Sequence, residues 1–463
     1  MRPAPGDAAD VLIIGAGVVG SAIARTLAGY ELSCLLVDSA ADVGTGTSKA
    51  NTAILHTGFD AEPGSLESRL LRRGSALLAG YARHAGIPVE RTGALVVAWT
   101  AEQAAALPGI ADKARRNGCA DVRPQTSAEI YAAQPHLGPG ARAGLAVPAE
   151  SIICPWTTTL AYATEAIRAG VRLLLRTRVT GVTAAAGEYR VDTTRGLLRC
   201  RWLVNAAGLD SDQIDRMLGG GAFTITPRRG ELIVFDKLAR PLVSTILLPV
   251  PTARTKGVLI APTVYGNLLL GPTAEDVPSR VDTATTAAGL AGLLGAGQRI
   301  VPALAGEEVT ATYAGLRAAT EHRDYQIRVD ERRRYACVGG IRSTGLSASL
   351  GIAEYVVDQL GAAGLKLTAR ETAGPPAMPY IGEAGLRPYQ DAARIAADPE
   401  YGRIVCHCER VTRGEIRDAL ASKLPPADLD GLRRRTRATN GRCQGFYCGA
   451  EVSELLAAHP GQA

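Results

Sequence analysis

Short apolar runs and helical spacing alternate at the start of the chain. Val11–Ile14 form an unbroken apolar run, an alanine-rich stretch with helical spacing continues to Gly29, and Leu32–Val37 form a second apolar run. Short apolar runs bounded by turn residues are typical of buried strands, and longer periodic stretches are typical of helices. The order strand, helix, strand predicts a parallel βαβ unit and therefore an α/β domain in this part of the chain.

The middle of the chain carries many short strand-like runs and two clear helical patterns. Helices are predicted over Thr100–Arg116 and Trp156–Ala169. Strands are predicted over Gly93–Trp99, Glu231–Phe235, Ser244–Leu248, Val258–Ile260, Asn267–Leu270 and Val309–Tyr313. From residue 370 to residue 401 Pro, Ala and Gly interrupt the periodicity, which is typical of a linker.

Length and composition limit the classes of protein that fit. With 463 residues, 46% of them hydrophobic, the chain is long enough for two or three domains with buried cores. Its net charge of +6 includes no long basic arm, so we expect no nucleic-acid partner. No segment approaches the ~20 apolar residues of a membrane span, so any membrane contact would be peripheral. The sequence predicts a cytoplasmic protein, bound at most to the inner face of a membrane.

The glycines after the first apolar run have the spacing of a dinucleotide-binding turn. Gly15, Gly17 and Gly20 stand directly between the predicted strand and helix, and Asp38 ends the second strand. In this context the first glycine allows a tight turn, the second lets the backbone approach a pyrophosphate, and the third allows close helix–strand packing. The N–H groups at the start of the helix would face the phosphates, and Asp38 would bind the adenosine ribose.

The nine cysteines fall into two groups. Five are spread through apolar runs, as is typical of buried free thiols in a reducing compartment: Cys34, Cys119, Cys154, Cys200 and Cys337. The other four form a Cys-x-Cys pair, Cys406 and Cys408, and a Cys-x4-Cys pair, Cys443 and Cys448. Thiolates gathered in fours bind zinc or an iron–sulfur cluster. Structural zinc sites usually separate paired cysteines by about two to four residues, so the tight first pair favours a cluster.

The residues around these cysteines resemble a known electron carrier. Ile404-Val-Cys-His-Cys-Glu-Arg-Val-Thr, Leu432-Arg-Arg-Arg-Thr-Arg and Arg442-Cys-Gln-Gly-Phe-Tyr-Cys resemble the [2Fe–2S] domain of bacterioferritin-associated ferredoxins. The same domain ends the large subunit of anaerobic FAD-dependent glycerol-3-phosphate dehydrogenase. The resemblance implies a [2Fe–2S] cluster on Cys406, Cys408, Cys443 and Cys448. The basic run 433–437 would either raise the potential of the cluster or form an exposed docking patch for an acidic partner, and His407 would tune the cluster or face solvent.

Several further motifs resemble the D-amino-acid-oxidase-type flavoprotein superfamily. They are Ser48–Gly58 with Glu62–Leu66, Arg201–Asp210, Tyr313–Ala318 with Asp324–Ile327, and Cys337–Leu346. Within the superfamily the segments look like glycerol-3-phosphate dehydrogenases and L-2-hydroxyglutarate dehydrogenase. Cys154 stands where relatives often carry aspartate, and Gly-Ile-Arg342-Ser-Thr-Gly replaces a form with Glu-Ser-Pro. No second nucleotide fingerprint occurs, so the cofactor implied is FAD and not NAD.

The resemblance implies a fold, a domain plan and a set of cofactor contacts. The expected class is α/β plus α+β, with a Rossmann-type FAD-binding domain, an antiparallel-sheet substrate domain and a small helical [2Fe–2S] domain. The expected ranges are 1–80, 143–220 and 330–372 for FAD, 81–142 and 221–329 for substrate, 373–401 for the linker and 402–463 for the cluster. Besides the glycines and Asp38, the expected FAD contacts are Val18, Val19, Ser39, Ser48, Asn51, Val179, Ala207, Gly208, Gly340, Thr344, Gly345 and Leu346.

Three residues are the expected catalytic candidates. His56 suits a general base at neutral pH, although it could instead pack against the flavin or be linked to it covalently. Arg317 could bind a phosphate or carboxylate through both arms of its guanidinium, or could form a structural ion pair. Arg229 is a secondary candidate for the flavin or substrate edge, with its neighbour Arg228 as the solvated one of the two.

Taken together, these motifs favour an FAD-dependent dehydrogenase of a small anionic alcohol. The leading substrate is sn-glycerol 3-phosphate, with electrons passing through the cluster to a partner flavoprotein or a quinone-linked acceptor. A 2-hydroxy acid of the L-2-hydroxyglutarate kind, or an amino acid or amine, remains an alternative substrate. A catalytically inactive electron-transfer subunit is a further alternative. The chain could also form a homo- or hetero-oligomer.

Overall fold

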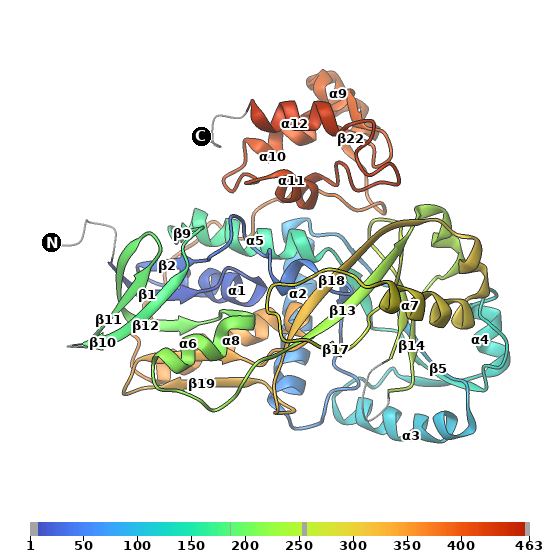
Figure 1. The fold of residues 1–463 in the computed structure, drawn as a ribbon, viewed down its shortest axis with the longest axis horizontal. Helices are drawn as coiled ribbons and strands as arrows, with labels where there is room; N and C mark the ends of the chain where they lie inside the picture. Colours follow the sequence, from blue (N-terminus) through green and yellow to red (C-terminus); the bar gives the residue numbers. More distant parts are fainter. Residues whose placement is uncertain (1–7, 186, 252–256, 459–463) are drawn as a thin grey trace.

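The structure, a computed structural model, describes residues 8–185, 187–251 and 257–458, which form two large sheets and a smaller cluster domain (Figure 1). The ends of the predicted domains at 1–7 and 459–463, residue 186 of the predicted FAD domain, and residues 252–256 of the predicted substrate domain lie outside these ranges. No helix within the described ranges has both the length and the apolar character needed to cross a membrane.

The first large sheet is built on the predicted βαβ unit. Its parallel core runs in the order β20, β12, β1, β2, β9, and antiparallel pairing adds β11, β10 and β19 at its sides. The strands are β1 (Ala8–Ile14), β2 (Cys34–Val37), β9 (Arg172–Leu174), β10 (Val179–Ala185), β11 (Glu188–Thr193), β12 (Gly196–Asn205), β19 (Gln326–Asp330) and β20 (Tyr335–Gly339). Since the core strands are parallel, their carboxyl ends share one edge, where ligands of such sheets bind.

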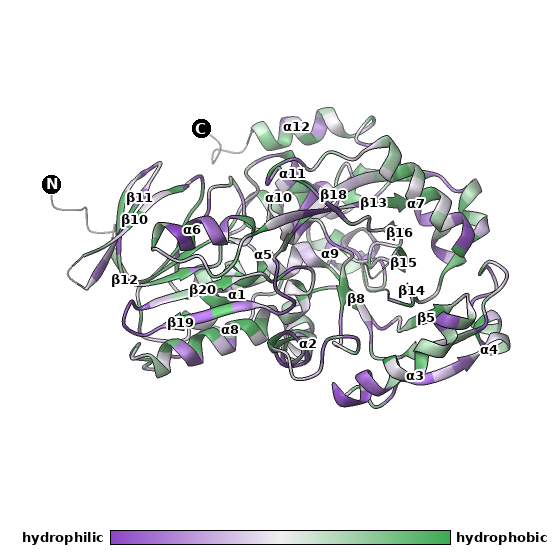
Figure 2. Ribbon diagram, turned by 60° about the horizontal axis from the view of Figure 1, so that its bottom comes forward, coloured by the Kyte–Doolittle hydropathy of each residue, from purple (hydrophilic) through white to green (hydrophobic). Residues whose placement is uncertain are grey.

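Helices cover this sheet and meet one another at very short range. They are α1 (Val18–Leu27), α2 (Leu66–Ala85), α5 (Pro155–Arg168), α6 (Ser211–Met217) and α8 (Gly345–Ala362). The helix α1 packs against α5 and α8, and α8 packs against α2. The α2–α8 crossing requires glycine, because a Cβ at Gly351 would lie 2.3 Å from the Leu70 carbonyl oxygen and a Cβ at Gly74 would lie 2.6 Å from the Ser347 oxygen. Figure 2 shows α8 largely in green, as expected for a helix buried along most of its length.

The second large sheet has nine strands in the order β17, β13, β16, β15, β14, β5, β7, β6, and β18 also pairs with β13. They are β5 (Ala94–Ala98), β6 (Arg123–Thr126), β7 (Ala143–Val147), β13 (Thr226–Phe235), β14 (Ile246–Pro249), β15 (Leu259–Pro262), β16 (Leu268–Gly271), β17 (Glu275–Asp276) and β18 (Val309–Ala319). All six strands predicted in this region are present. The sheet is antiparallel apart from the pairing of β14 with β5, which is parallel. The helices α3 (Ala101–Arg116), α4 (Ser127–Ala133) and α7 (Ala287–Ile300) belong to this part of the chain.

Two strands lie across the predicted domain borders. The strand β7 falls in a segment expected to belong to the FAD domain, yet it pairs with β5 and β6 in the second sheet. The strand β19 falls in the expected substrate segment, yet it pairs with β20 in the first sheet. In a third, small sheet, β3 (Ile54–Leu55) and β4 (Val89–Glu90) both pair with β8 (Ser151–Ile153).

The cysteine motifs lie in a separate small domain, drawn in red at the top of Figure 1. It contains the hairpin of β21 (Ile404–Cys406) and β22 (Val411–Thr412) and the helices α10 (Arg413–Leu420), α11 (Leu429–Thr436) and α12 (Gly449–Ala457) around their own apolar core. The predicted linker is not free of structure, since it contains α9 (Ala392–Ala397), and its backbone bonds the body of the protein at Ala85 and Val264. The class predicted from the sequence, a Rossmann-type domain with a second sheet domain and a small helical domain, is confirmed.

Candidate active site and cluster centre

The glycine turn sits at the carboxyl end of β1 with the geometry that a dinucleotide needs. Gly15 has φ +104°, and a Cβ at Gly20 would lie 1.8 Å from the Gly15 carbonyl oxygen. A Cβ at Gly17 would meet only the Ser48 hydroxyl, at 3.2 Å, so the space in front of it is open. The helix α1 begins at Val18, followed by Val19, with no acidic residue in its first turn. Its positive end can therefore accept a pyrophosphate.

Two side chains hold the adjoining loops against this turn. Asp38, at the end of β2, accepts hydrogen bonds from the N–H groups of Ala16 (2.7 Å) and Ala40 (2.8 Å). Burial raises the pKa of Asp38 and outweighs these two bonds. Ser48 accepts a hydrogen bond from the Val18 N–H at 2.9 Å. The predicted contacts Asp38 and Ser48 thus lie beside the fingerprint, while Ser39 is exposed next to Asp38.

The remaining predicted FAD contacts line the same edge of the first sheet. Ala207 and Gly208 follow β12, where the Ala206 N–H bonds the Ile14 carbonyl oxygen at the end of β1. Val179 begins β10, farther along the sheet. Asn51 turns the loop after Ser48, accepting from the Ala53 N–H at 2.8 Å and donating to the Ser48 carbonyl oxygen at 2.9 Å.

The predicted flavin loop, Cys337–Leu346, runs from the end of β20 into the first turn of α8. Gly340 has φ +62°, and Thr344 bonds Tyr325 at 2.6 Å and Glu67 at 2.8 Å. Arg342 forms an ion pair with the same Glu67 carboxylate. The helix α8 begins at Gly345 without a side-chain cap and without an acidic residue in its first turn. Its N-terminal N–H groups therefore remain available to stabilise negative charge on a ligand.

His56 leaves the small third sheet and is fixed at both its backbone and its side chain. Its N–H donates to the Ser347 hydroxyl at 2.9 Å, in the first turn of α8. Its Nδ1 lies 3.0 Å from Oε2 of Glu150. Glu150 is fully buried, and its other oxygen accepts from the Thr57 N–H at 2.6 Å and the Thr57 hydroxyl at 2.7 Å. These donors suit an ionised carboxylate, which places the proton of a neutral His56 on Nδ1 and leaves Nε2 free to accept one.

Glu150 is the functional candidate that sequence reasoning missed. It lies in the turn between β7 and β8, 94 residues from His56. The pairing of β3 with β8 sets Leu55 opposite Ser151, and this register brings Glu150 next to His56. The sequence signal is faint, since a glutamate before a buried Ser-Ile-Ile run resembles an ordinary turn residue.

Arg317 lies on β18 between the two loops that carry the predicted flavin contacts. The carbonyl oxygen of its neighbour Leu316 accepts from Thr47 at 2.7 Å, and Ala318 forms a β-bridge with Arg342. The Arg317 guanidinium donates to the Thr273 carbonyl oxygen at 2.5 Å, and within the described ranges it has no carboxylate within ion-pair distance. Burial, together with the nearby Arg228 charge, lowers the pKa of Arg317 to about 10. The nearest carboxylate that acts on it, Asp276, is already paired with Arg228, so this partly desolvated cation is suited to bind an anionic substrate.

Arg229 and Arg228 are adjacent on β13 and point to opposite sides. Arg229 is buried among three carboxylates, with Glu275 at 2.6 Å, Glu231 at 3.8 Å and Asp282 at 3.9 Å. The three carboxylates compensate the positive charge of Arg229, so the geometry favours a structural role over the predicted catalytic role. Arg228 is half-buried and pairs with Asp276 at 2.6 Å.

The four cluster cysteines come together as two pairs. The Cys406 thiol interacts with the Cys448 thiol, and the Cys408 thiol with the Cys443 thiol. Across the ranges described, no three His, Cys, Asp or Glu side chains converge as ligands of a single ion would. Two thiol pairs instead fit two irons, each taking two thiolates. The loop is close-packed around them, because a Cβ at Gly441 would lie 2.2 Å from the Cys408 Cβ.

Backbone donors converge on one of these sulfurs. The backbone N–H groups of Tyr447, Gly445 and Phe446 lie close enough to the Cys443 sulfur to lower the pKa of Cys443, and that of Tyr447 contributes most. Such N–H···S bonds are how proteins stabilise the negative charge of a cluster. The donor set therefore fits the [2Fe–2S] cluster implied by the motifs. His407 is exposed, in agreement with the solvent-facing alternative.

The basic run at the C-terminal end of α11 faces the rest of the protein and not solvent. Arg435 binds both oxygens of Asp42, at 2.6 and 2.9 Å, and Arg434 binds Asp42 at 3.0 Å. The Arg434 and Arg435 side chains are only 11% and 5% exposed. Hydrogen bonds from Arg435 more than offset burial and lower the pKa of Asp42. The run is therefore an internal anchor between domains, and not the exposed patch that one of the two sequence alternatives described.

Comparison with known proteins agrees with this geometry. The family of FAD dependent oxidoreductases matches residues 10–359, and the BFD-like [2Fe-2S] binding domain matches residues 404–458. The glycerol 3-phosphate dehydrogenase of Caloramator mitchellensis is 35% identical over 451 residues, covering 97% of this chain and 94% of that protein. Human mitochondrial L-2-hydroxyglutarate dehydrogenase is 29% identical over 292 residues, covering 59% of this chain and 62% of that protein.

A solved structure shares the fold of the first two sheets. Dithionite-reduced L-α-glycerophosphate oxidase from Mycoplasma pneumoniae, with FAD bound, superposes with a TM-score of 0.76 at 27% identity and covers 81% of this chain and 100% of that chain. The resemblance found in the separate motifs is thereby confirmed, as is the prediction of an enzyme with FAD and a [2Fe–2S] cluster. The chain belongs to the FAD-dependent oxidoreductase family and carries a BFD-like [2Fe–2S] binding domain in residues 404–458.

Proposed function

We propose that the protein is an FAD-dependent dehydrogenase of sn-glycerol 3-phosphate that passes the electrons through its [2Fe–2S] cluster to an external acceptor. The observation that carries this proposal is the combination of the His56–Glu150 pair with Arg317, which has no carboxylate partner among the described residues, at the edge that holds the predicted flavin contacts. A base and a free cation are what the oxidation of an anionic alcohol requires.

His56 would take the hydroxyl proton of the substrate. Glu150 holds the imidazole by Nδ1, which directs the lone pair of Nε2 outward, and Ser347 holds the backbone of the same residue. The bound FAD would supply the hydride acceptor, N5 of its ring. The fixed histidine would bring its acceptor nitrogen to the hydroxyl, so that little reorganisation is needed when the proton leaves.

Arg317 would bind the anionic group of the substrate and so orient the carbinol carbon. Its guanidinium is held by the Thr273 carbonyl oxygen, and it lies on the strand that also contacts the Ser48–Asn51 loop, because Tyr313 donates to the Asn51 carbonyl oxygen at 2.8 Å. A planar guanidinium can bind phosphate through two parallel hydrogen bonds. The relative that matches this chain most extensively among those described above oxidises glycerol 3-phosphate by name, which supports phosphate as the anion.

The length of the matches supports the dehydrogenase outcome over the oxidase outcome. The dehydrogenase of Caloramator mitchellensis matches 97% of this chain, a span that includes the cysteine motifs, whereas the glycerol 3-phosphate oxidase of Mycoplasma pneumoniae matches 75% of it. The retained cluster would give electrons an outlet other than oxygen. Phe446 and Tyr447, between Cys443 and Cys448, are 84% and 77% exposed, and they would contact the acceptor, a flavoprotein or a quinone-linked protein.

A 2-hydroxy acid of the L-2-hydroxyglutarate kind is the second candidate. Arg317 is a single guanidinium without a carboxylate counter-ion in the described part of this site, and one fork satisfies a carboxylate more completely than a phosphate dianion. The identity of 29% with L-2-hydroxyglutarate dehydrogenase is consistent with this alternative.

Anaerobic flavin bleaching separates the two candidates. The purified holoenzyme, with FAD and iron quantified, is mixed with sn-glycerol 3-phosphate or with L-2-hydroxyglutarate, and the visible absorption of the flavin is followed. We expect bleaching by glycerol 3-phosphate alone. Bleaching by L-2-hydroxyglutarate alone would replace the proposed substrate with the second candidate. Bleaching by dithionite but by neither compound would refute both.

A further inference from the structure

Besides the contacts of Arg434 and Arg435 with Asp42, a second set of contacts between the cluster domain and the rest of the protein converges on one arginine, Arg437. Arg437 is the residue that ends α11, and only 6% of its side chain is exposed. Its guanidinium lies 4.1 Å from the centre of the Tyr265 ring and 5.9 Å from that of Trp156. It also pairs with Glu409 at 3.0 Å and reaches Asn267 of the second sheet at 3.4 Å. One cluster-domain side chain thus contacts both large parts of the protein.

The backbone of Arg437 shows that the side chain is retained against local preference. Its φ is +75°, at the position after a helix where glycine is strongly favoured because a Cβ is unfavourable there. An arginine at such a position costs stability unless its side chain makes contacts that compensate. The buried contacts with Tyr265 and Glu409 provide that compensation.

The aromatic pair under Arg437 leads directly to the loop that carries the predicted flavin contacts. Trp156 and Tyr265 are stacked, with ring centres 5.2 Å apart and planes 20° apart. The indole N–H of Trp156 donates to the Lys49 carbonyl oxygen at 3.0 Å, between Ser48 and Asn51. Tyr265 is fixed at its other end, where its hydroxyl lies 2.8 Å from the Cys154 sulfur. The rings therefore form a rigid bridge between this loop and the cluster domain.

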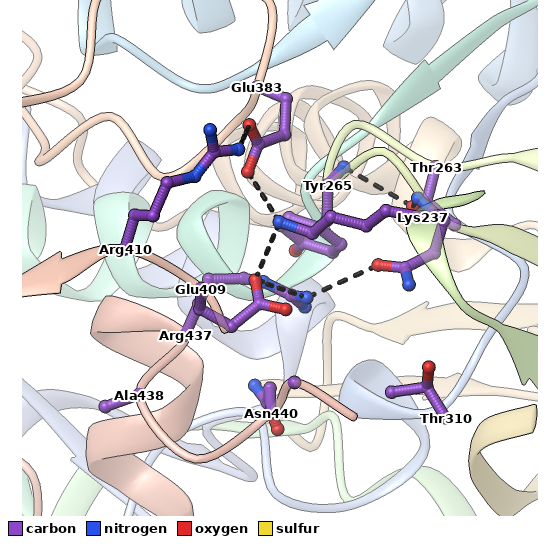
Figure 3. A network of polar contacts seen from close by, with 12 residues as sticks. Lys237, Thr263, Tyr265, Thr310, Glu383, Glu409, Arg410, Arg437, Ala438 and Asn440 are labelled. Atoms are coloured by element: carbon purple, nitrogen blue, oxygen red, sulfur yellow. Dashed lines mark hydrogen bonds and ion pairs between the residues drawn. The ribbon is translucent and has the colours of Figure 1, made fainter. Parts of the chain in front are cut away.

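Through Glu409, Arg437 also contacts the β21–β22 hairpin, which carries Cys406 and Cys408. Glu409 directly follows Cys408, is buried, and also binds Lys237 at 3.1 Å. Figure 3 shows Lys237 between Glu409 and Glu383, with Arg410 at the outer end of the network. Two positive groups from different elements thus hold the residue next to a cluster ligand, which fixes the hairpin relative to the second sheet.

We propose that Arg437 is a positioning residue that holds the Cys406–Cys408 hairpin at a fixed distance from the Ser48–Asn51 loop through the Trp156–Tyr265 pair, so that flavin-to-cluster electron transfer takes place within one chain. This inference rests on the proposed electron route, but not on the identity of the substrate. Oxidation of one alcohol yields two electrons and two protons. The cluster takes one electron at a time, so two passages follow each substrate, with both electrons leaving to the external acceptor and the protons to solvent.

The test uses Arg437→Gly in the FAD- and iron-loaded protein. Glycine suits the backbone at this position, so a loss of function in this variant does not arise from strain at the end of α11. The flavin is reduced by a laser flash with a sacrificial donor, or by substrate, and cluster reduction is followed by absorbance and by the electron paramagnetic resonance of the reduced cluster. We expect unchanged flavin reduction and cluster reduction slowed by about tenfold or more, since a lost buried ion-pair partner shifts the docked state by at least the ~1.4 kcal/mol of a tenfold change.

Three comparisons make the result decisive. Arg410→Gly is the matched control. Arg410 also has positive φ (+52°), but it is exposed and contacts Glu383 and the Tyr389 ring at the edge of the network, so cluster reduction in this variant should keep the rate of the unsubstituted protein. Arg437→Lys keeps the charge over Tyr265 and should restore most of the rate. Limited proteolysis of 373–401 should be faster in Arg437→Gly alone, which reports undocking without any turnover.

Each outcome bears on a separate statement. Cluster reduction at the unsubstituted rate in Arg437→Gly, with full iron and FAD, would overturn the positioning role. Equal slowing by Arg410→Gly would also overturn it, because the effect would then belong to the hairpin and not to the Arg437 contacts. Absence of substrate bleaching in the unsubstituted protein, together with flash-driven cluster reduction that is slowed in Arg437→Gly, would refute the proposed substrate and support the positioning role.

Discussion

The buried Glu150 next to His56 allows the catalytic arrangement to be tested by replacing a single carboxylate oxygen with an amide NH2 group. In Glu150→Gln the amide oxygen can still accept from Thr57, while the amide NH2 faces Nδ1 of His56 at the 3.0 Å now spanned by a hydrogen bond. An NH2 group can only donate, so Nδ1 would have to accept and the proton would move to Nε2. The imidazole would then present a proton to the substrate instead of a lone pair.

The expected loss follows from what a positioned base contributes. General-base catalysis supplies roughly 10²–10⁴ in rate, and the wrong tautomer removes it, so flavin reduction should slow by about that factor, or ~2.7–5.4 kcal/mol in activation free energy. Substrate affinity should change little, because Arg317 and not His56 is expected to bind the anion. The assay is anaerobic stopped-flow bleaching of the flavin over a range of substrate concentrations, with FAD content measured for every variant.

Variants of Thr57 and His56 provide the controls for Glu150→Gln. Thr57→Val removes one donor to Glu150 and keeps the bond to His56, so it should cost less than about tenfold. Because Glu150 acts through His56, the double variant with His56→Ala should be no slower than His56→Ala alone. Flavin reduction at the unsubstituted rate in Glu150→Gln, or additive losses in the double variant, would show that the pair does not work as a unit.

Three further outcomes test other parts of the structure. Gly351→Ala places a methyl group 2.3 Å from the Leu70 carbonyl oxygen at the α2–α8 crossing, so it should lower the free energy of unfolding by about 1–3 kcal/mol in urea, whereas Gly292→Ala, which meets nothing within 4 Å, should not. Arg317→Gln removes the positive charge expected to bind the anionic group of the substrate, so kcat/KM for that substrate should fall by about 30-fold or more (~2 kcal/mol), and an unchanged value would show that Arg317 does not bind the anion. Cys443→Ala should abolish the cluster absorption while FAD remains bound, and retention of both iron atoms in that variant would exclude the assigned ligand set.

The sequence was informative wherever function depends on neighbours along the chain. The Gly15–Gly20 turn, the acidic end of β2 and the paired cysteines all lie within short segments, so their spacing alone carries the chemistry. The substrate-domain strands were predicted for the same reason, since alternation of apolar residues is local. What local patterns do not contain is which strands pair and in which register.

Three examples show which contacts local patterns cannot predict. Glu150 meets His56 only because β3 and β8, strands of two and three residues, pair in one register, and strands this short have no readable period. Arg229 and Arg228 are adjacent in the sequence, and only the sheet decides that one is buried among carboxylates. The arginine run looks like a solvated basic surface until Asp42, 393 residues away from Arg435, is brought to it by domain docking.

The contact between Asp42 and Arg435 also bears on how the two cofactors are installed. Asp42 lies in the loop between Asp38, the predicted ribose contact, and Gly44, whose N–H bonds the Ala16 carbonyl oxygen of the fingerprint at 2.9 Å. One loop therefore serves the adenosine half of FAD on one side and the cluster domain on the other. Coupling between two binding events is reciprocal, so whatever effect FAD loading has on cluster-domain docking, docking has on FAD affinity to the same extent.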